Sequence, residues 1–207
     1  MSKSVLKDIL SLPAYEAAPC ILGMKLTHLS VMGEVSGVAT EVKAYQQDAP
    51  TSHSFGGMTE RNKAMFGPFG HAYIYLSYGV HWCLNVVTDR EGFGSGVLIR
   101  GLKLLDGVDI ATLRFNAYDI SSLSPAKLRS LSDGPGKVTQ ALGVTKDLYG
   151  SSLVDGLEPL KIELDLEIPK MYISNTARIG ISKAVDVPWR WTVDDSYIDK
   201  YLAVSSR

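Results

Sequence analysis

Several tyrosines, Tyr45, Tyr73, Tyr75 and Tyr78, lie in or beside β-rich runs of the sequence. Alternation along a strand places Tyr73 and Tyr75 on one face. Tyr78 directly precedes Gly79, where a side chain can project from a turn. Projecting aromatic rings can stack on nucleic-acid bases, a contact worth about 1–3 kcal/mol per base. The alternative is that these rings pack in a core with hydrogen-bonded hydroxyls, and the tyrosines alone leave both interpretations open.

The order of the short segments around these tyrosines carries more information than any one segment. A strand with Tyr45 is followed by a loop with His53, a Tyr-x-Tyr-x-x-Tyr-Gly run, a strand with Asn85 and an apolar strand that ends at Arg100. In this order and spacing the chain resembles the alkyladenine (3-methyladenine) DNA glycosylase family over about residues 15–195. The resemblance is carried by Leu22-Gly23, Glu41–Tyr45, Ser52–Ser54, Arg61-Asn62, Tyr73–Gly79, Cys83–Val87, Val97–Arg100, Gly134–Lys137, Ala141–Gly143 and Arg178–Ile181.

The resemblance implies a base-excision repair protein that flips damaged purines, alkylated or deaminated, out of duplex DNA and hydrolyses the N-glycosidic bond. By this resemblance, Tyr78 is the wedge that fills the gap left by the flipped nucleotide. Tyr45 and Tyr75, with the loop that carries His53, sandwich the extruded base. Asn85 excludes bases such as guanine. Extrusion is required because an enzyme cannot reach its target atom inside the stacked duplex.

The catalytic part of the resemblance involves Arg100, the backbone near residues 179–181 and position 43. Arg100, with that backbone, would hold the attacking water or the sugar-phosphate. In the family a glutamate activates the water, and here the matching residue is Lys43. Glu41 lies on the same face by alternation but roughly 6.6 Å further along the strand. A general base must lie within about 3 Å of its proton or one water away, so we expect that Glu41 does not substitute.

Lys43 leaves several readings open. The protein could be a catalytically inactive DNA-lesion-binding protein, because a protonated lysine cannot take a proton from water. Lys43 could instead attack the sugar as an unprotonated amine and form a Schiff base, which requires a pKa well below about 10.4. Activity could also survive on good leaving groups through binding and orientation alone. Finally, Lys43 could be a point change in an otherwise ordinary enzyme.

The elements that must position these residues come as strands in early pairs with helices around them. Residues 5–23 are expected to be helical with a break near Pro13, and residues 24–32 and 35–45 to form strands joined at Gly33-Glu34. We predict an α+β fold: a single domain over residues 1–207 with a curved, mainly antiparallel sheet flanked by helices. Further strands are expected at residues 71–78, 81–88, 96–105, 160–168, 179–182 and 189–193, and a turn at residues 133–137.

The composition bears on the binding partners, the cellular location and the metal content that we expect for this protein. A net charge of −1 does not indicate a strongly basic DNA-binding surface, although a basic face can be hidden in the total. The absence of a long apolar run or signal peptide and the presence of only Cys20 and Cys83 favour an intracellular location. A zinc site needs four ligands, and no second pair accompanies His81 and Cys83. The resemblance implies double-stranded DNA containing damaged bases as the partner and no metal or cofactor, and we expect a monomer.

Overall fold

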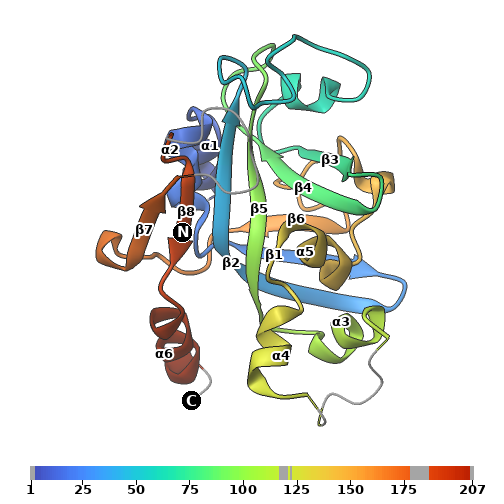
Figure 1. The fold of residues 1–207 in the computed structure, drawn as a ribbon, viewed down its shortest axis with the longest axis vertical. Coiled ribbons are helices and arrows are strands. Elements are labelled where there is room, and N and C mark those ends of the chain that lie inside the picture. Colours follow the sequence, from blue (N-terminus) through green and yellow to red (C-terminus); the bar gives the residue numbers. More distant parts are fainter. Residues whose placement is uncertain (1–2, 117–120, 122, 178–186, 206–207) are drawn as a thin grey trace.

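The protein is built on one curled antiparallel sheet (Figure 1). The computed structural model describes residues 3–116, 121, 123–177 and 187–205, together with the side chains of those up to residue 201. The strands run in the order β3-β4-β5-β2-β1-β6, while β8 pairs with β2 and β7 pairs with β8. Their bounds are β1 Lys25–Ser30, β2 Gly33–Gln46, β3 Ala72–Ser77, β4 His81–Val87, β5 Ser95–Leu104, β6 Leu160–Glu163, β7 Ile173–Thr176 and β8 Arg190–Val193. The prediction of an α+β fold with a curved, mainly antiparallel sheet is confirmed.

The helices flank this sheet. Among them, α2 packs against β2 and β5, α5 packs against β4 and β5, and α3 contacts both α5 and β2. The helix bounds are α1 Lys3–Leu10, α2 Ala14–Ile21, α3 Val108–Arg114, α4 Pro125–Ser130, α5 Pro135–Leu142 and α6 Asp195–Ser205. Short 3₁₀ helices lie at Lys63–Phe66, Lys146–Leu148 and Lys170–Tyr172. In the described part of the chain, no helix has both the length and the apolar character needed to cross a membrane.

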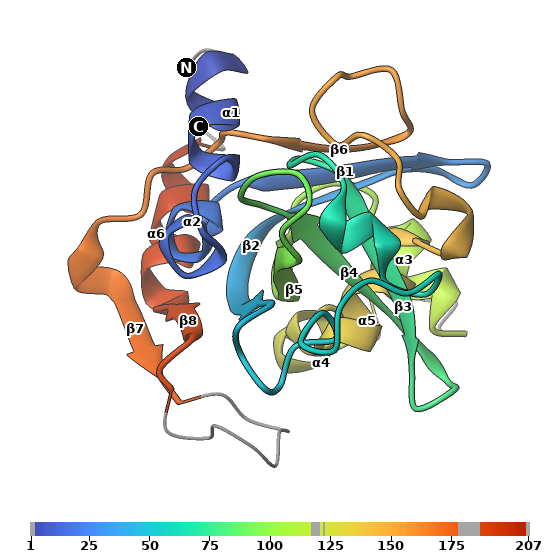
Figure 2. The same ribbon diagram turned by 90° about the horizontal axis from the view of Figure 1, so that it is seen from above.

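The central strands separate their side chains onto two faces. Because successive side chains point to opposite sides of a strand, one set enters the core under α2 and α5. The buried set from β2 to β5 includes Val42, Ala44, Ala72, Ile74, Leu84, Val86, Val97 and Ile99. The intervening residues therefore face away from this core, and they include Lys43, Tyr75 and Asn85. Seen from above, β2 curves across the sheet and the β3–β4 hairpin projects from its edge (Figure 2).

Two predicted connections were wrong. The turn between β1 and β2 is Val31-Met32, because Ser30 pairs directly with Gly33 in the ladder. Residues 133–137 were expected to be a turn, but α5 begins at Pro135. Proline suits the first helical position because its missing N–H would have no partner there and its φ is already helical.

The later strands also depart from the prediction. The strand expected over residues 160–168 ends at Glu163, where pairing with β1 stops. Leu166 instead donates its backbone N–H to the Gly23 carbonyl. The short strand β7 was missed, because it is largely exposed and has no apolar alternation. The strand expected at 179–182 and the backbone near 179–181 lie outside the described residues.

Candidate base-binding site

The face of the sheet opposite the core forms the floor of a cavity of about 510 Å³. Cross-strand pairing joins Lys43 to Leu98, Leu98 to Asn85, and Asn85 to Tyr73. These four residues from β2, β5, β4 and β3 therefore form one row across the sheet. Lys43 is almost fully buried, with 1% of its surface exposed, and Asn85 is 2% exposed. The cavity floor thus places a lysine and an amide in one cross-strand row, with Leu98 between them and both almost fully buried.

One wall of the cavity is aromatic. The rings of His53 and Tyr75 contact edge to face with centroids 4.5 Å apart, and Tyr73 stacks on Tyr75 at 5.4 Å. His53 Nδ1 lies 3.0 Å from the Tyr73 hydroxyl. Burial raises the pKa of both Tyr73 and Tyr75, so both keep their hydroxyl protons at neutral pH. Since His53 and Tyr75 touch each other, no base fits between them, and they form one wall with Tyr45 elsewhere in the lining.

The loop that carries His53 is held in place by Asn62. The buried Asn62 side chain donates to the carbonyls of His53 at 2.8 Å and Gly57 at 3.0 Å, and it accepts from the Thr59 N–H at 2.6 Å. Sequence reasoning quoted Asn62 as part of a motif but assigned it no role. Its three hydrogen bonds give it one, because they fix the backbone on which His53 lies.

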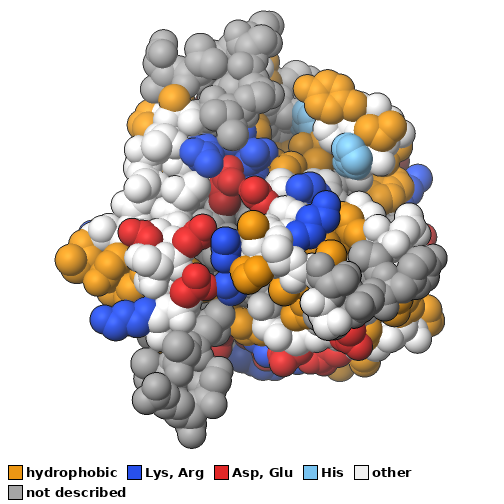
Figure 3. All heavy atoms as spheres, turned by 60° about the horizontal axis from the view of Figure 1, so that its bottom comes forward, with side chains coloured by type: hydrophobic (Ala, Val, Ile, Leu, Met, Phe, Trp, Pro, Cys, Tyr) orange, Lys and Arg blue, Asp and Glu red, His pale blue; other side chains and the backbone are white. Residues whose placement is uncertain are grey.

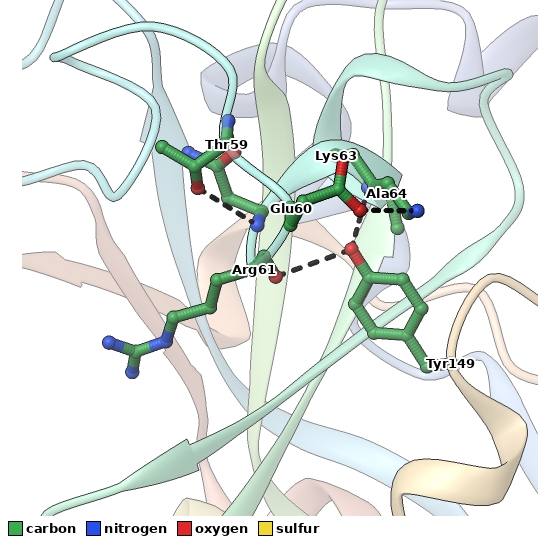
Figure 4. A network of polar contacts seen from close by, with 7 residues as sticks. Thr59, Glu60, Arg61, Lys63, Ala64 and Tyr149 are labelled. Carbon is green, nitrogen blue, oxygen red and sulfur yellow. Dashed lines mark hydrogen bonds and ion pairs between the residues drawn. The ribbon is translucent and has the colours of Figure 1, made fainter.

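The turn at residues 61–64, which follows the His53 loop, is held by Tyr149, a residue outside the strands of the sheet. The Tyr149 hydroxyl accepts from the Ala64 N–H at 2.9 Å and donates to the Arg61 carbonyl at 3.2 Å (Figure 4). The Arg61 side chain extends away from Tyr149 in Figure 4, and its guanidinium donates to the Leu76 carbonyl at 3.2 Å. Arg61 therefore lines the cavity and connects the loop to β3.

The tip of the β3–β4 hairpin presents Tyr78. Its side chain is 93% exposed, and its backbone adopts φ 50°, followed by φ 73° at Gly79. The Val80 N–H donates to the Ser77 carbonyl at 3.1 Å, which completes a type I′ turn. Glycine takes this left-handed conformation readily, whereas in a tyrosine the conformation costs about 1–2 kcal/mol of free energy. A strained, exposed aromatic residue at a cavity mouth indicates a role other than packing.

The hairpin is supported by the start of α5. Thr139 donates its hydroxyl to the Trp82 carbonyl at 2.8 Å. A Cβ added to Gly136 would lie 2.9 Å from the His81 Cβ, so only glycine allows this approach. Pro135 reaches the cavity lining itself. The Gly-Pro-Gly-Lys motif thus starts a helix that supports β4.

Glu41 is not among the described residues that line the cavity, and the β2–β5 ladder is irregular beside it. Register shifts occur on both sides of Glu41, so Thr40 and Arg100 have no direct partner in this ladder. Glu41 Oε1 accepts from Arg100 Nε at 2.6 Å and from Arg190 Nε at 2.8 Å. The expectation that strand alternation keeps Glu41 on the same face as Lys43 is supported by the regular β2–β8 ladder, in which both residues flank the core residue Val42. It is also supported by the bond from Arg190, which is the direct cross-strand partner of Lys43.

Glu41 is held as a carboxylate. Burial alone would raise its pKa, but the hydrogen bonds and charges of Arg190 and Arg100 outweigh burial and hold the pKa below its ordinary value. Glu41 lines a second cavity, of about 530 Å³, between the sheet, α4 and α6. Figure 3, turned so that the lower end of the molecule comes forward, shows acidic and basic side chains intermixed over the middle of that face.

The seven candidate residues from the sequence all line the cavity on the sheet: Lys43, Tyr45, His53, Tyr75, Tyr78, Asn85 and Arg100. Sequence reasoning gave no role to Tyr73, Arg61, Met65 or Cys83, which also line it. For Tyr73 the strand alternation was a usable signal. Met65 comes from a 3₁₀ helix, and its place here depends on tertiary packing.

Fold and site together define an α+β protein with a deep, aromatic-walled cavity that can hold a planar ring. The chain belongs to the methylpurine-DNA glycosylase family, whose family model matches residues 8–197. It is 43% identical over 179 residues to a protein of Methanoculleus marisnigri named "Putative 3-methyladenine DNA glycosylase", covering 85% of this chain and 88% of that one. Proteins with the same name from Rhodopseudomonas palustris strain BisB18 and Agrobacterium fabrum are 44% and 40% identical, over 91% and 88% of this chain and 87% and 85% of theirs.

Proposed function

We propose that this chain, acting as one domain over residues 1–207, is a DNA glycosylase that extrudes damaged purines from duplex DNA and hydrolyses the N-glycosidic bond. The observation that carries the proposal is the cavity itself, where ring walls, an amide floor and an exposed tyrosine at the mouth meet on one face of the sheet. The family and its named relatives support the reaction. In this proposal water is the nucleophile, Arg100 helps to hold it, and Tyr45 packs on the base opposite Tyr75 and His53.

The direct test is release of free base from duplex DNA that contains hypoxanthine or a methylated purine. Chromatography of the released base is preferable to strand cleavage, because it reports the glycosidic bond alone. Undamaged duplex and a Tyr75→Ala variant are the controls. Release from damaged duplex that is reduced in Tyr75→Ala supports the proposal. Equal release from undamaged duplex, or none from any substrate, contradicts it.

A second candidate function is lesion binding without cleavage, and Lys43 is the observation that favours it. Among the described residues that line the cavity there is no Asp or Glu, so none of these residues supplies a carboxylate to activate water. This candidate predicts tight binding of damaged duplex without base release. If base is released, borohydride reduction separates the two chemistries, because it traps a Schiff base formed by Lys43 and leaves no adduct after attack by water.

Tyr78 is proposed as the wedge. Replacing it by alanine should weaken binding of damaged duplex by about 1–3 kcal/mol, the value of a base-stacking contact. The fold should be unaffected, because the Tyr78 side chain is 93% exposed. Fluorescence anisotropy measures the affinity, and 2-aminopurine beside the lesion reports extrusion. Leu157→Ala, which removes another exposed apolar side chain, is the matched control. Unchanged affinity and unchanged 2-aminopurine fluorescence would remove the wedge role.

Asn85 is proposed to discriminate between bases. Its amide nitrogen donates to the Tyr73 carbonyl at 3.1 Å, which fixes the orientation of the amide on the cavity floor. An Asn85→Ser variant should accept guanine-type bases, because the shorter side chain leaves room for their exocyclic amino group. The measurement is the ratio of affinities for hypoxanthine and guanine in matched duplexes. A ratio equal to that of the unmodified protein argues against the exclusion role.

A further inference from the structure

The aromatic wall of the cavity rests on a small hydrophobic cluster of its own. Met65, Phe66, Tyr73 and Val87 form this cluster, which is separate from the main core under α2 and α5. Tyr149, a half-buried residue, packs against it but is not among the described residues that line the cavity. Because a small cluster buries little apolar surface, hydrogen bonds must contribute to keeping this region ordered.

The loop side of the wall depends on side chains for its order. Residues 47–62, which include His53, contain no helix or strand, so their backbone groups need other partners. Asn62 holds the His53 carbonyl from within this segment. The Tyr149 hydroxyl binds the backbone on both sides of Asn62, at the Arg61 carbonyl and the Ala64 N–H (Figure 4). One hydroxyl group therefore fixes the turn that carries the anchor of His53.

Tyr149 is itself attached to the strand side of the wall. Its segment runs along β3, which lies at the edge of the sheet. The Gly150 N–H donates to the Ala72 carbonyl at 2.8 Å, and the Ala72 N–H donates to the Ser151 carbonyl at 2.9 Å. The Tyr149 ring also contacts the Tyr73 ring edge to face, with centroids 6.1 Å apart. Tyr149 thus connects β3 to the turn at residues 61–64.

We infer that Tyr149 is a positioning residue for base extrusion, and that its hydroxyl fixes His53 relative to β3 before a base arrives. The inference rests on the proposed function, since it concerns how the cavity receives an extruded base. Tyr149 acts through the wall and does not touch the base. A wall that must become ordered during binding costs binding free energy, whereas a wall that is already ordered does not.

Tyr149→Phe tests this inference, because it removes the hydroxyl and keeps the ring that packs on Tyr73. Fluorescence anisotropy compares the affinity for duplex that contains hypoxanthine or a methylated purine with that for undamaged duplex. A 2′-fluoroarabino sugar at the damaged nucleotide prevents cleavage, so anisotropy reports binding alone. The preference for damaged duplex should fall about three- to tenfold, the factor that hydrogen bonds of this kind contribute. At saturating protein, 2-aminopurine beside the lesion should report less extrusion.

Tyr197→Phe is the matched control. Tyr197 is also half-buried, its hydroxyl donates to the Glu167 carbonyl at 3.4 Å, and its ring stacks on Tyr172 with centroids 4.3 Å apart. It is not among the described residues that line the cavity. This variant loses the same group and should keep the full preference for damaged duplex. Urea unfolding of both variants measures any general loss of stability.

The outcomes separate this inference from the proposed function. If the unmodified protein does not prefer damaged duplex, the proposed function and the inference both fail. If it does and Tyr149→Phe keeps that preference, only the inference is overturned. An equal loss of affinity for damaged and undamaged duplex also overturns it, because Tyr149 would then stabilise the fold without positioning the wall. A loss confined to damaged duplex and absent from Tyr197→Phe supports the inference.

Discussion

A Lys43→Glu variant is expected to release damaged bases about 10²–10⁴ times faster than the unmodified protein, the usual contribution of a positioned general base. Position 43 lies on the cavity floor, in the same cross-strand row as Asn85. A carboxylate there would replace a basic group in a cavity whose described lining has no acid. It would both take a proton from water and stabilise the positive charge that develops on the sugar. Single-turnover base release from hypoxanthine-containing duplex measures the effect.

Lys43→Gln is the matched control for this experiment. Glutamine removes the positive charge and has the same length as glutamate, but it cannot act as a base. If Lys43→Gln gains as much as Lys43→Glu, the benefit comes from lost repulsion and not from proton transfer. If the unmodified protein is faster than both variants, Lys43 itself takes part in the chemistry. Borohydride trapping then identifies lysine attack.

Glu41 does not offer an alternative base in this structure. Its carboxylate accepts from Arg100 and Arg190 at 2.6 Å and 2.8 Å, and these partners hold its pKa below the ordinary value of 4.5. A carboxylate stabilised in this way is a weaker base than a free one. It also lines the second cavity and not the cavity that contains Lys43. Activity of the unmodified protein must therefore depend on other groups.

The local pattern of the sequence was sufficient to predict which residues share the cavity face. Alternation has a period of two, so Tyr73 and Tyr75 were expected together, and both line the cavity; Ser77, two residues further along, lines it as well. The same period relates Glu41 to Lys43 along the β2–β8 ladder. Alternation could not predict that Glu41 pairs with Arg100 and Arg190 and is not among the described residues that line the cavity.

Contacts between residues far apart in the chain also could not be predicted from the sequence. Arg190 reaches Glu41 from 149 positions away, and Tyr149 reaches the Arg61 carbonyl from 88 positions away. Such contacts depend on the path of the whole sheet, in which β8 adds to the edge of β2. A helix was expected at residues 138–142, and its first turn at Pro135 was missed for a local reason, since Gly-Pro-Gly suggests a turn. Proline at a first helical position was the signal that could have corrected this prediction.

A Glu41→Gln variant is expected to lose about 3 kcal/mol of unfolding free energy, because it leaves two largely buried guanidinium groups without their carboxylate. The side chains involved are only 13–22% exposed, so solvent screens the pair weakly. Urea unfolding measures the loss. Asp199→Asn is the control, since Asp199 also pairs with a basic residue, Lys103, but is 51% exposed. That variant should lose less than about 1 kcal/mol.

The pH dependence of this loss provides a second check on the same ion network. The pKa of Glu41 is depressed in the folded protein, so the unfolded chain binds its proton first as the pH falls. The stabilisation by Glu41 is therefore fully present above about pH 4.5 and disappears as the pH falls through the folded pKa. The difference between the unmodified protein and Glu41→Gln should shrink over that acidic range. A difference that is under 1 kcal/mol at pH 7, or that stays constant on acidification, would show that the pairing of Glu41 with Arg100 and Arg190 does not stabilise the fold.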